Sequence, residues 1–447
     1  MALSGIQIYK LLPQTNCKDC GFPTCLAFAM KLAAKQVELI ACPHVSPESK
    51  TQLAESAAPP IRLVALKANS YEVKAGNEVV LFRHEKTFYH KPGVFLRVTD
   101  ADPIDQIKTR VTTGEAYRVN YVGIDLTLDG FAVASLTGDA TSFSAAVSAV
   151  REASHRPLIL MSRSPEIIAA GLRAIDGETP LIYGAEASNW EAMAELAKQH
   201  KAALAVIAPT LQALAELTEK IKEKGVEDLV LDPGGRNFGP ALTLNTQIRR
   251  LALKKNFRPL GYPLIAFPGE IAEPSLEAMF GAQSIAKYAG FVVLDHFAPE
   301  AVYPLLVLRQ NIYTDPQKPI QVQPGLYEIN NPKPEDPLLV TTNFSITYFS
   351  VANEVEGSGL PAWLLVTDAE GMSVLTAWAA GKFDAERIAK SVKAFNVGDK
   401  VSRKRIVLPG HVAVLSGELE EELPGWEIRV GPREAVDIPS FMKQVLT

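Results

Sequence analysis

Residues 181–231 read LIYGAEASNWEAMAELAKQHKAALAVIAPTLQALAELTEKIKEKGVEDLVL, and this stretch contains two consecutive strand–helix units followed by a third strand. Each short apolar run is followed by a longer segment whose apolar residues recur at helical spacing. Because a helix between two strands returns the chain to the edge from which it started, this order predicts parallel strands joined by helical crossovers. The expected strands are Leu181–Tyr183, Leu204–Ile207 and Leu229–Leu231, and the expected helices are Trp190–His200 and Leu211–Lys224.

The same alternation continues in both directions, from about Ile61 to Gln323. About eight strand–helix units in about 260 residues predict a (β/α)8 TIM-like barrel, with a doubly wound open sheet as the alternative. The segment Asn69–Lys91 resembles a β-hairpin inserted near the start of the barrel. The remaining strand candidates are Val94–Val98, Val119–Ile124, Leu158–Met161, Leu264–Phe267 and Phe291–Leu294, and the remaining helix candidates are Ser275–Tyr288 and Glu300–Tyr313.

A proline-rich linker at Gln323–Pro337 precedes a smaller α/β segment. Four short strands there alternate with helices, which predicts a flavodoxin-like or Rossmann-like layer sandwich that binds ligands beyond the carboxyl ends of its strands. The chain is therefore expected to be α/β, with domains at residues 1–58, 59–323 and 324–447. The strands are expected at Leu338–Thr341, Leu364–Thr367, Ile406–Leu408 and Ile428–Val430, and the helices at Ser345–Val355, Ser373–Gly381, Ala385–Phe395, Val412–Glu422 and Glu434–Leu446.

Small and hydroxyl-bearing residues, with few charges, follow the strands of this C-terminal segment. These residues, together with the N–H groups of helix N-termini, suit a large, mostly neutral ligand that carries amide groups around its edge. A nucleotide would more naturally call for a G-x-G-x-x-G turn, and no such turn follows a strand in this segment. Ordinary loop caps explain the pattern equally well. The residues concerned are Thr341-Thr342-Asn343 with Ser345 and Thr347, the loop Asp368–Leu375, the turn Pro409–Val412, and Gly431-Pro432.

Four cysteines, the only ones in the chain, lie within its first 42 residues with the spacing C-x2-C-x4-C-x16-C. Such a group matches the needs of an iron–sulfur cluster, in which each iron takes one protein sulfur. A helix expected from Thr24 to about Ile40 would direct its N-terminus, with its partial positive charge, at this anionic group. The spacing therefore predicts a [4Fe–4S] cluster. The predicted ligands are Cys17, Cys20, Cys25 and Cys42.

Two other uses of the cysteines stay open. Zinc sites usually have two paired C-x-x-C elements or histidines, whereas this chain has one such pair, and His44 reads as an ordinary surface residue that could add a ligand. Disulfides need an oxidising compartment, and Met1–Lys10 lacks the charged and apolar regions of a signal peptide. We therefore expect a cytoplasmic protein with reduced thiols.

The composition is that of an ordinary globular protein, with 47% hydrophobic residues, 21% charged residues and a net charge of −5. It contains no basic block, which argues against nucleic-acid binding. No apolar run reaches the roughly 18 residues that a helix needs to cross a bilayer. We therefore expect neither nucleic acid nor a membrane among the partners.

Taken together, the cysteine module, the barrel and the small C-terminal domain resemble the large (gamma) subunit of the corrinoid iron–sulfur protein of the acetyl-CoA synthase/carbon monoxide dehydrogenase system. The resemblance covers the whole chain. Its sharpest anchor is Cys17-Lys-Asp-Cys20-Gly-Phe-Pro-Thr-Cys25 with Cys42, and the loop Thr367-Asp-Ala-Glu-Gly-Met-Ser-Val374 resembles the cobalamin contact of that family. It implies a corrinoid, a cobalamin-type cofactor, in the C-terminal domain. The implied corrinoid contacts are Thr341, Thr347, Gly371, Met372, Ser373, Val374, Gly431 and Pro432.

The resemblance also implies a methyl carrier of the reductive acetyl-CoA (Wood–Ljungdahl) pathway, by which anaerobes fix carbon. Co(I) of the corrinoid would accept a methyl group from methyltetrahydrofolate on a separate methyltransferase and deliver it to acetyl-CoA synthase/carbon monoxide dehydrogenase. The [4Fe–4S] cluster would return occasional Co(II) to Co(I). A small, barrel-type subunit would form a heterodimer with this chain and cover the corrinoid.

The C-terminal segment has one histidine, His411 in Leu408-Pro-Gly-His-Val-Ala-Val414. Methionine-synthase-type cobalamin modules carry D-x-H-x-x-G, whose histidine binds cobalt from below, and the Asp and Gly of that motif are both missing here. We therefore expect His411 to be a loop residue, with the corrinoid held base-off and without a protein ligand to cobalt. Weak axial donation would make reduction to Co(I) easier.

Two other functions stay open. Four carboxylates, Asp125, Asp232, Glu270 and Asp295, lie near predicted strand ends, where barrel active sites are built, and Gly234-Gly235 could approach a pterin. The barrel could thus be a pterin-dependent methyltransferase with its own redox centre, although strand-end carboxylates also serve as helix N-caps. The other alternative is a plain iron–sulfur electron-transfer protein.

Overall fold

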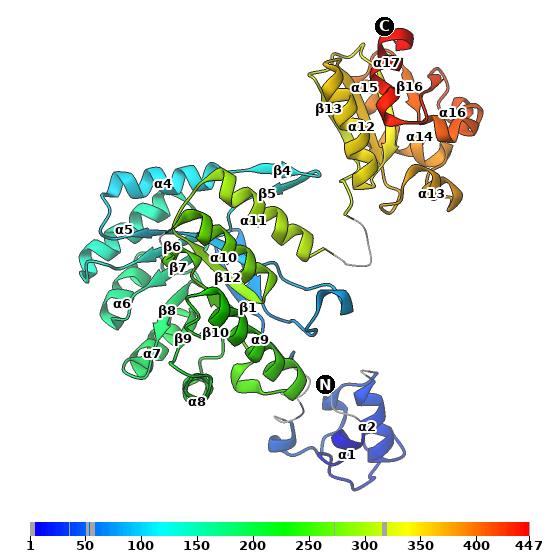
Figure 1. Cartoon of the computed structure of the whole chain (residues 1–447). Coiled ribbons are helices and arrows are strands. Elements are labelled where there is room, and N and C mark those ends of the chain that lie inside the picture. The colour runs from blue at the N-terminus through cyan, green and yellow to red at the C-terminus, as the bar shows by residue number, and fades with distance from the viewer. Residues whose placement is uncertain are drawn as a thin grey trace. The chain divides into compact units, whose positions relative to one another are not determined.

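Eight parallel strands close into a barrel in the central part of the chain (Figure 1). The computed structural model describes residues 5–34, 36–50, 53, 59–271, 273–314 and 320–446. The barrel closes because its last strand pairs with its first, with Phe291 opposite Gly93 and Leu294 opposite Leu96. This closure confirms the predicted (β/α)8 barrel and excludes the open sheet. The strands are β3 (Gly93–Thr99), β6 (Gly130–Ala134), β7 (Leu158–Met161), β8 (Leu181–Ala185), β9 (Ala203–Ile207), β10 (Leu229–Asp232), β11 (Leu264–Ala266) and β12 (Ala289–Leu294).

A helix follows each barrel strand and covers the outside of the barrel (Figure 1). Apolar residues three to four positions apart explain this placement: in α8, Leu214, Leu217 and Ile221 are buried. Thr210 begins that helix by accepting a hydrogen bond from Ala213 N at 3.2 Å. The helices are α4 (Ile104–Ala116), α5 (Ala140–Ala153), α6 (Pro165–Arg173), α7 (Trp190–His200), α8 (Leu211–Glu223), α9 (Phe238–Lys255), α10 (Pro274–Ala286) and α11 (Pro299–Ile312).

A β-hairpin, β1 (Val64–Ala68) and β2 (Tyr71–Ala75), covers the N-terminal end of the barrel. Its residues Val64, Leu66 and Val73 belong to the same apolar cluster as Phe95 and Phe291 inside the barrel. A hairpin insertion was predicted here, but it begins before Asn69 and its paired strands end at Ala75. The hairpin thus completes the core at the end of the barrel opposite to that at which barrel enzymes place their active sites.

The prediction that Val119–Ile124 is a barrel strand is wrong. This segment forms most of a short antiparallel hairpin, β4 (Val119–Tyr121) and β5 (Ile124–Leu126), and the barrel strand that follows β3 is β6. The sequence of β6, GFAVA, is short and rich in small residues, so it gave no strong strand pattern. The hairpin groups with the C-terminal part of the chain: the two compact units are Met1–Tyr117 with Thr127–Tyr313, and Arg118–Leu126 with Thr314–Thr447.

The turn of the β4–β5 hairpin places Val122 and Gly123 at positive φ, 49° and 80°. Such a turn usually takes Asn-Gly, and left-handed backbone costs a residue with a Cβ about 1–2 kcal/mol. Val122 is only 5% exposed, and it packs in an apolar cluster of the C-terminal unit that also contains Val322 and Ile329. Because full burial of a valine side chain contributes about 1.5–3 kcal/mol, packing in the C-terminal unit offsets the cost of the turn.

The C-terminal unit contains a five-stranded sheet in the order β13-β15-β14-β16-β17. Its four parallel strands follow the flavodoxin-like order 2-1-3-4, which confirms the predicted layer sandwich. The antiparallel edge strand β13 lies inside the segment Gln323–Pro337, so the prediction that this whole segment is a linker is wrong. Prolines flank β13 without interrupting its pairing. The strands are β13 (Gly325–Ile329), β14 (Leu338–Thr342), β15 (Ala362–Thr367), β16 (Arg405–Leu408) and β17 (Glu427–Val430).

Helices cover both faces of this sheet (Figure 1). One apolar cluster joins Val340 and Leu408 to Ile388 and Leu419 on one face. The other face joins the cluster that contains Val122, Val355 and Ile438. The elements are α12 (Ser345–Ser358), α13 (Val374–Ala379), α14 (Ala385–Ala394), α15 (Val397–Lys400), η5 (Gly410–Leu415), α16 (Ser416–Glu422), η6 (Ala435–Asp437), α17 (Ile438–Phe441) and η7 (Met442–Leu446).

The N-terminal module contains α1 (Gly5–Tyr9), α2 (Cys25–Ala33) and a 3-10 turn, η1 (Leu39–Ala41). The helix predicted from Thr24 to about Ile40 is therefore shorter than expected. The linker predicted at Ala54–Pro60 lies, apart from its last two prolines, outside the described residues, and the three-domain division stays a prediction. In the described part of the chain, no helix combines the length and the apolar character that a bilayer span requires.

Candidate functional site

A cavity of about 320 Å³ opens at the carboxyl ends of β14 and β16. These two strands are neighbours at the point where the strand order of the sheet reverses, and open α/β sheets bind ligands at such points. Most of the predicted corrinoid contacts line this cavity, whereas Gly371 and Met372 do not. The predicted contacts that line it are Thr341, Thr347, Ser373, Val374, Gly431 and Pro432.

Thr341, at the end of β14, provides a test of whether the cavity fits the predicted cofactor. Its side chain is fully buried, and its Oγ1 has no hydrogen-bond partner among the described residues. A buried polar group without a partner costs about 1–3 kcal/mol, and a ligand in the cavity that Thr341 lines would remove this cost. The amide-bearing side chains of a corrinoid offer both donors and acceptors, so this hydroxyl fits that cofactor.

The loop that follows β15 is held in place by Asn343, which is 1% exposed. Asn343 Oδ1 accepts hydrogen bonds from Ala369 N at 2.9 Å and from Gly371 N at 3.0 Å. Gly371 has a φ of 73°, and Met372 packs against the apolar cluster on one face of the sheet. These two predicted contacts therefore support the loop, whereas the next residues, Ser373 and Val374, line the cavity.

Several residues that line the cavity were missed by the sequence analysis. Leu339 lies two positions before Thr341, on the same face of β14, and Ser350 and Val351 lie one helical turn after Thr347. Strand and helix periodicity could have found these three. No local pattern relates Ile438, which comes from the end of the chain, to the other lining residues.

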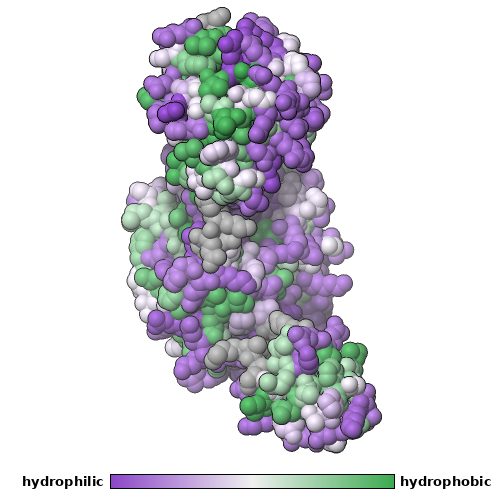
Figure 2. All heavy atoms as spheres, turned by 90° about the vertical axis from the view of Figure 1, so that its right-hand side faces the viewer, coloured by the Kyte–Doolittle hydropathy of each residue, from purple (hydrophilic) through white to green (hydrophobic). Residues whose placement is uncertain are grey.

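The rim of the cavity carries both charged and apolar side chains. His411 lies in η5 and lines the cavity, with its Nε2 3.8 Å from Glu434 Oε1 and its side chain 36% exposed. Ile346 and Leu375 also line the cavity and are 65% and 46% exposed. Figure 2 shows hydrophobic residues gathered on the surface of the C-terminal unit, at the top of the view. Exposed apolar side chains around a cavity are typical of a surface that a partner covers.

The four cysteines of the N-terminal module differ in exposure. Cys25 and Cys42 are buried and Cys20 is partly buried, and all three pack in one apolar cluster with Phe28. Cys17 is exposed. Cys25 is the first residue of α2, and its backbone N–H donates to Asn16 Oδ1 at 2.8 Å. The fold thus places these three cysteines in one apolar cluster, and Cys25 lies at a helix N-terminus, where partial positive charge favours an anionic group.

Beside the fourth cysteine, Asp19 and His44 form an exposed pair with 2.6 Å between Asp19 Oδ2 and His44 Nε2. The hydrogen bond from His44, followed by that from Cys17, lowers the pKa of Asp19. Potential ligand atoms of these three residues all lie within 4.8 Å of one another. Because His44 already pairs with Asp19, its role in the described structure is that of a polar neighbour of Cys17.

The carboxylates predicted at the barrel mouth are engaged by arginines. Asp232 is fully buried, accepts a hydrogen bond from Tyr183 Oη at 2.7 Å, and is 2.7 Å from Arg236 Nη2. Glu270 accepts from Arg236 Nε at 2.6 Å, and Asp295 pairs with an arginine of β3. The fourth carboxylate, Asp125, lies in β5 and not at the end of a barrel strand, so its predicted placement is wrong.

These pairs make the barrel mouth a poor place for acid–base chemistry. Burial, followed by the charge of Asp232, raises the pKa of Tyr183, which therefore stays a protonated donor at neutral pH. Gly234 of the Gly234-Gly235 pair donates its backbone N–H to Asp232 Oδ1 at 2.9 Å. This N–H is therefore already used within the protein. The Asp232 carboxylate is thus occupied by a guanidinium, a phenol and a backbone N–H, which leaves it no room to contact a substrate. The geometry therefore favours a structural role for the group that contains Asp232.

We expect the variant Arg236→Met to lower the free energy of unfolding of the barrel by about 3–5 kcal/mol, since it leaves the buried Asp232 without its cation. Arg163 lies over the ring of the same tyrosine, Tyr183, but its side chain is 45% exposed. The matched control Arg163→Met should therefore change stability by less than about 1 kcal/mol. Denaturant unfolding measures both values, and equal stabilities of the two variants would contradict the structural role.

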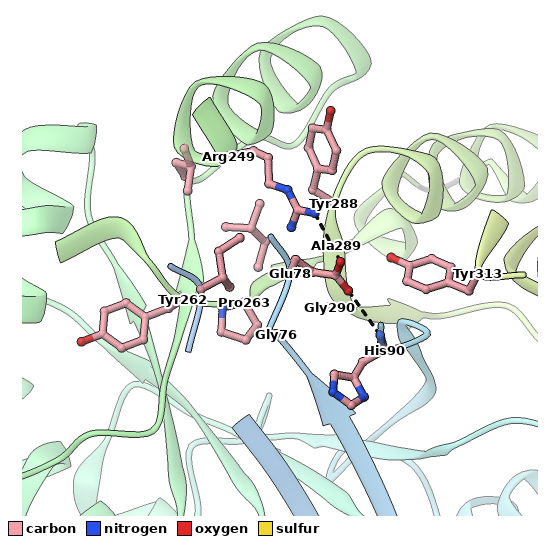
Figure 3. A pocket seen from close by; sticks show the side chains of 13 residues that line it. Gly76, Glu78, His90, Arg249, Tyr262, Pro263, Tyr288, Ala289, Gly290 and Tyr313 are labelled. Carbon is pink, nitrogen blue, oxygen red and sulfur yellow. Dashed lines mark hydrogen bonds and ion pairs between the residues drawn. The ribbon is translucent and has the colours of Figure 1, made fainter. Parts of the chain in front are cut away.

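A much smaller cavity, of about 20 Å³, lies at the N-terminal end of the barrel (Figure 3). Glu78 Oε2 lies 3.5 Å from Arg249 Nη2, and Figure 3 shows Arg249 and Tyr313 pointing towards Glu78 from different sides. Burial raises the pKa of Glu78, although Arg249 opposes this shift. A space of this size holds about one water molecule. This end of a barrel serves stability and not catalysis, so the large cavity of the C-terminal unit is the candidate site.

Comparison with known proteins shows the family to which the chain belongs. The family model of the CO dehydrogenase/acetyl-CoA synthase delta subunit matches residues 63–442. A second model, "Putative Fe-S cluster", matches residues 12–44, which include all four cysteines. The corrinoid/iron–sulfur protein large subunit of Moorella thermoacetica is 45% identical over 443 residues, which cover 99% of each chain. The chain belongs to this large-subunit family.

The family extends to archaea. The acetyl-CoA decarbonylase/synthase complex subunit gamma of Methanopyrus kandleri is 34% identical over 456 residues, which cover 99% of this chain and 98% of that protein. Among solved structures, dihydropteroate synthase of Thermus thermophilus matches 56% of this chain and 97% of that chain, with 16% identity and a TM-score of 0.37. The last likeness is too weak to support an argument about this chain. Membership of the large-subunit family rests on the full-length relatives.

Proposed function

We propose that this chain is a corrinoid-dependent methyl carrier of the reductive acetyl-CoA pathway. It accepts a methyl group from methyltetrahydrofolate with the help of a methyltransferase and delivers it to acetyl-CoA synthase. The methyl group moves as a cation equivalent and leaves its bonding electrons on the pterin nitrogen, so the transfer itself consumes no external electron. Free thiols persist in a reducing compartment, and we place the protein in the cytoplasm.

The observation that supports this proposal most directly is the cavity of the C-terminal unit. In a family named for a corrinoid and an iron–sulfur protein, the cavity lies where an open α/β sheet binds its ligand. The buried hydroxyl of Thr341, which has no hydrogen-bond partner among the described residues, supports a ligand with hydrogen-bonding groups. By contrast, the pairing of Asp232 and Glu270 with Arg236 gives no support to a pterin-binding, catalytic barrel.

When bound, a corrinoid supplies a cobalt ion that can accept and release a methyl group. The chain itself supplies the surroundings. Three hydroxyl groups in the cavity would bind the amide groups of the corrinoid, those of Thr341, Thr347 and Ser373. Apolar contacts from Val374 and Leu375 would exclude water. His411 pairs with Glu434 on the rim, and we propose that it is no ligand of the metal, which leaves the cofactor base-off.

We further propose that Cys17, Cys20, Cys25 and Cys42 hold a [4Fe–4S] cluster. Such a cluster would supply single electrons at a potential set by hydrogen bonds and burial, and one such electron would return an oxidised Co(II) corrinoid to Co(I). The N-terminus of α2, which begins at Cys25, favours an anionic group there. Because Cys17 is exposed, one edge of such a cluster would lie near the surface, where electrons would enter or leave.

The partners follow from the same scheme. A small subunit would form a heterodimer with this chain and cover the apolar rim that includes Ile346 and Leu375. The methyltransferase and the acetyl-CoA synthase/carbon monoxide dehydrogenase complex would then approach the corrinoid in turn. This part of the proposal rests on the family and on the exposed apolar residues.

Metal analysis of the full-length protein, purified without oxygen, tests the proposal. We expect about four irons and about one cobalt per chain, with the absorption bands of a corrinoid and of an iron–sulfur cluster in one spectrum. Iron without cobalt would identify an electron-transfer protein instead. Zinc in place of iron would contradict the cluster.

A further inference from the structure

The β4–β5 hairpin is encoded between a helix and a strand of the barrel, yet it is part of the C-terminal unit. Its tip, Val122, packs in the apolar cluster of that unit, and Val122 O accepts a hydrogen bond from Gln323 N at 3.3 Å. A side chain at Gly123 would lie 2.6 Å from Tyr327 Oη and 2.9 Å from Gln323 Cβ. The tip therefore fits closely against the segment Ile320–Gln323.

The segment Ile320–Gln323 runs along the start of α12 and carries one polar side chain towards the cavity loop. Val322 N donates to Asn343 O at 2.9 Å, and Gln321 forms an isolated β-bridge with Phe344. Gln321 Oε1 accepts from Asn343 Nδ2 at 3.4 Å. A Cβ at Gly371 would lie 2.7 Å from Gln321 Cγ, so the Gln321 side chain packs directly against the loop.

Asn343 links this segment to the loop that leads into the cavity. In addition to accepting from Ala369 N and Gly371 N, it donates from Nδ2 to Asp368 Oδ1 at 3.2 Å. The loop then continues into Ser373 and Val374, which line the cavity. Val122, Gln321 and Asn343 thus form a continuous set of contacts from the hairpin tip to the cofactor site, with Gln323 as the backbone connection at the tip.

We propose that Gln321 and Asn343 are positioning residues for the corrinoid and that the β4–β5 hairpin holds the segment that carries Gln321. The proposal rests on the proposed function of this cavity. If so, the cofactor site needs the β4–β5 hairpin, although this hairpin lies between α4 and β6 of the barrel in the sequence. Corrinoid affinity should then depend on Gly123, although this residue does not line the cavity.

Binding of aquocobalamin to the full-length, corrinoid-free protein tests this proposal, with affinity measured by the quenching of tryptophan fluorescence. We expect Gln321→Ala and Gly123→Val each to weaken binding about fivefold to tenfold, the amount that one lost hydrogen bond would give. Because both variants interrupt one set of contacts, the double variant should bind no more weakly than the weaker single variant. Gln321→Glu, which keeps the acceptor for Asn343 Nδ2, should restore most of the affinity.

Arg118→Ala is the matched control, since Arg118 lies beside the same hairpin, is 66% exposed and pairs with Asp125. It should leave the affinity unchanged. Thermal unfolding is measured in parallel, because a purely structural role would lower the unfolding temperature without changing the affinity at low temperature. If Gly123→Val does not fold, Val122→Ala replaces it. Unchanged affinity in the Gln321 or in the hairpin variant overturns the proposal, whereas absence of binding by the unaltered chain overturns the proposed function instead.

Discussion

The variant Thr347→Trp should contain little or no cobalt after anaerobic purification. Thr347 is the third residue of α12, is partly exposed and lines the cavity of about 320 Å³. An indole at this position would project into the space that the corrinoid needs, without displacing a buried core residue. Cobalt per chain, measured by elemental analysis, should fall from about one to nearly zero, while the iron content stays unchanged.

A smaller change at the same position separates loss of space from loss of a hydrogen bond. Thr347→Val keeps the volume of the side chain and removes only the hydroxyl, so it should retain cobalt and weaken corrinoid binding by less than about tenfold. Full retention of cobalt by Thr347→Trp would show that the corrinoid does not occupy this cavity. Loss of iron as well would show that the variant has a general folding defect.

The variant Cys20→Ala should lose nearly all of its iron. Each iron of a [4Fe–4S] cluster needs one protein thiolate, and the described structure offers no further cysteine near Cys20 to replace it. The corrinoid should still bind, because its cavity lies in the other compact unit. We therefore expect a variant that contains cobalt but no cluster. Its Co(II) should no longer be reduced by low-potential reductants that act through the cluster.

The matched control for this experiment is His44→Ala, which removes a polar neighbour of Cys17 and leaves the four thiols intact. It should keep about four irons per chain. Loss of metal in this variant would favour a mixed cysteine–histidine site of the zinc type over the cluster. Loss of cobalt in Cys20→Ala would contradict the independence of the two cofactor sites.

The parts of the fold with strong local signals were predicted well. The strands at Leu158–Met161 and Leu204–Ile207 are apolar along their whole length, because both faces of a parallel strand in a barrel are buried. Helices such as Leu211–Glu223 show their buried stripe in the sequence. The likeness to one family pointed to the cavity residues Thr341 and Ser373 before any geometry was known.

Two of the errors share one physical cause. Val119–Ile124 is apolar enough to be read as a barrel strand, but Val122 and Gly123 turn the chain back at positive φ, and the core of the C-terminal unit compensates the cost of that turn. Gly325–Ile329 was read as linker because prolines surround it, although it pairs with β15 as an edge strand. In both cases the deciding contact lies far away in the chain.

Local pattern was therefore sufficient for the grouping of the four cysteines, for most strands and helices and for the small, polar residues at the strand ends of the C-terminal segment, because these depend on neighbours a few residues apart. Contacts across the fold were needed to pair Asp232 with Arg236, to bury the Thr341 hydroxyl without a partner, and to join the β4–β5 hairpin to Gln321 and to the loop that follows β15. The free energy of each of these features comes from burial and pairing between distant segments, and no periodicity along the chain encodes it.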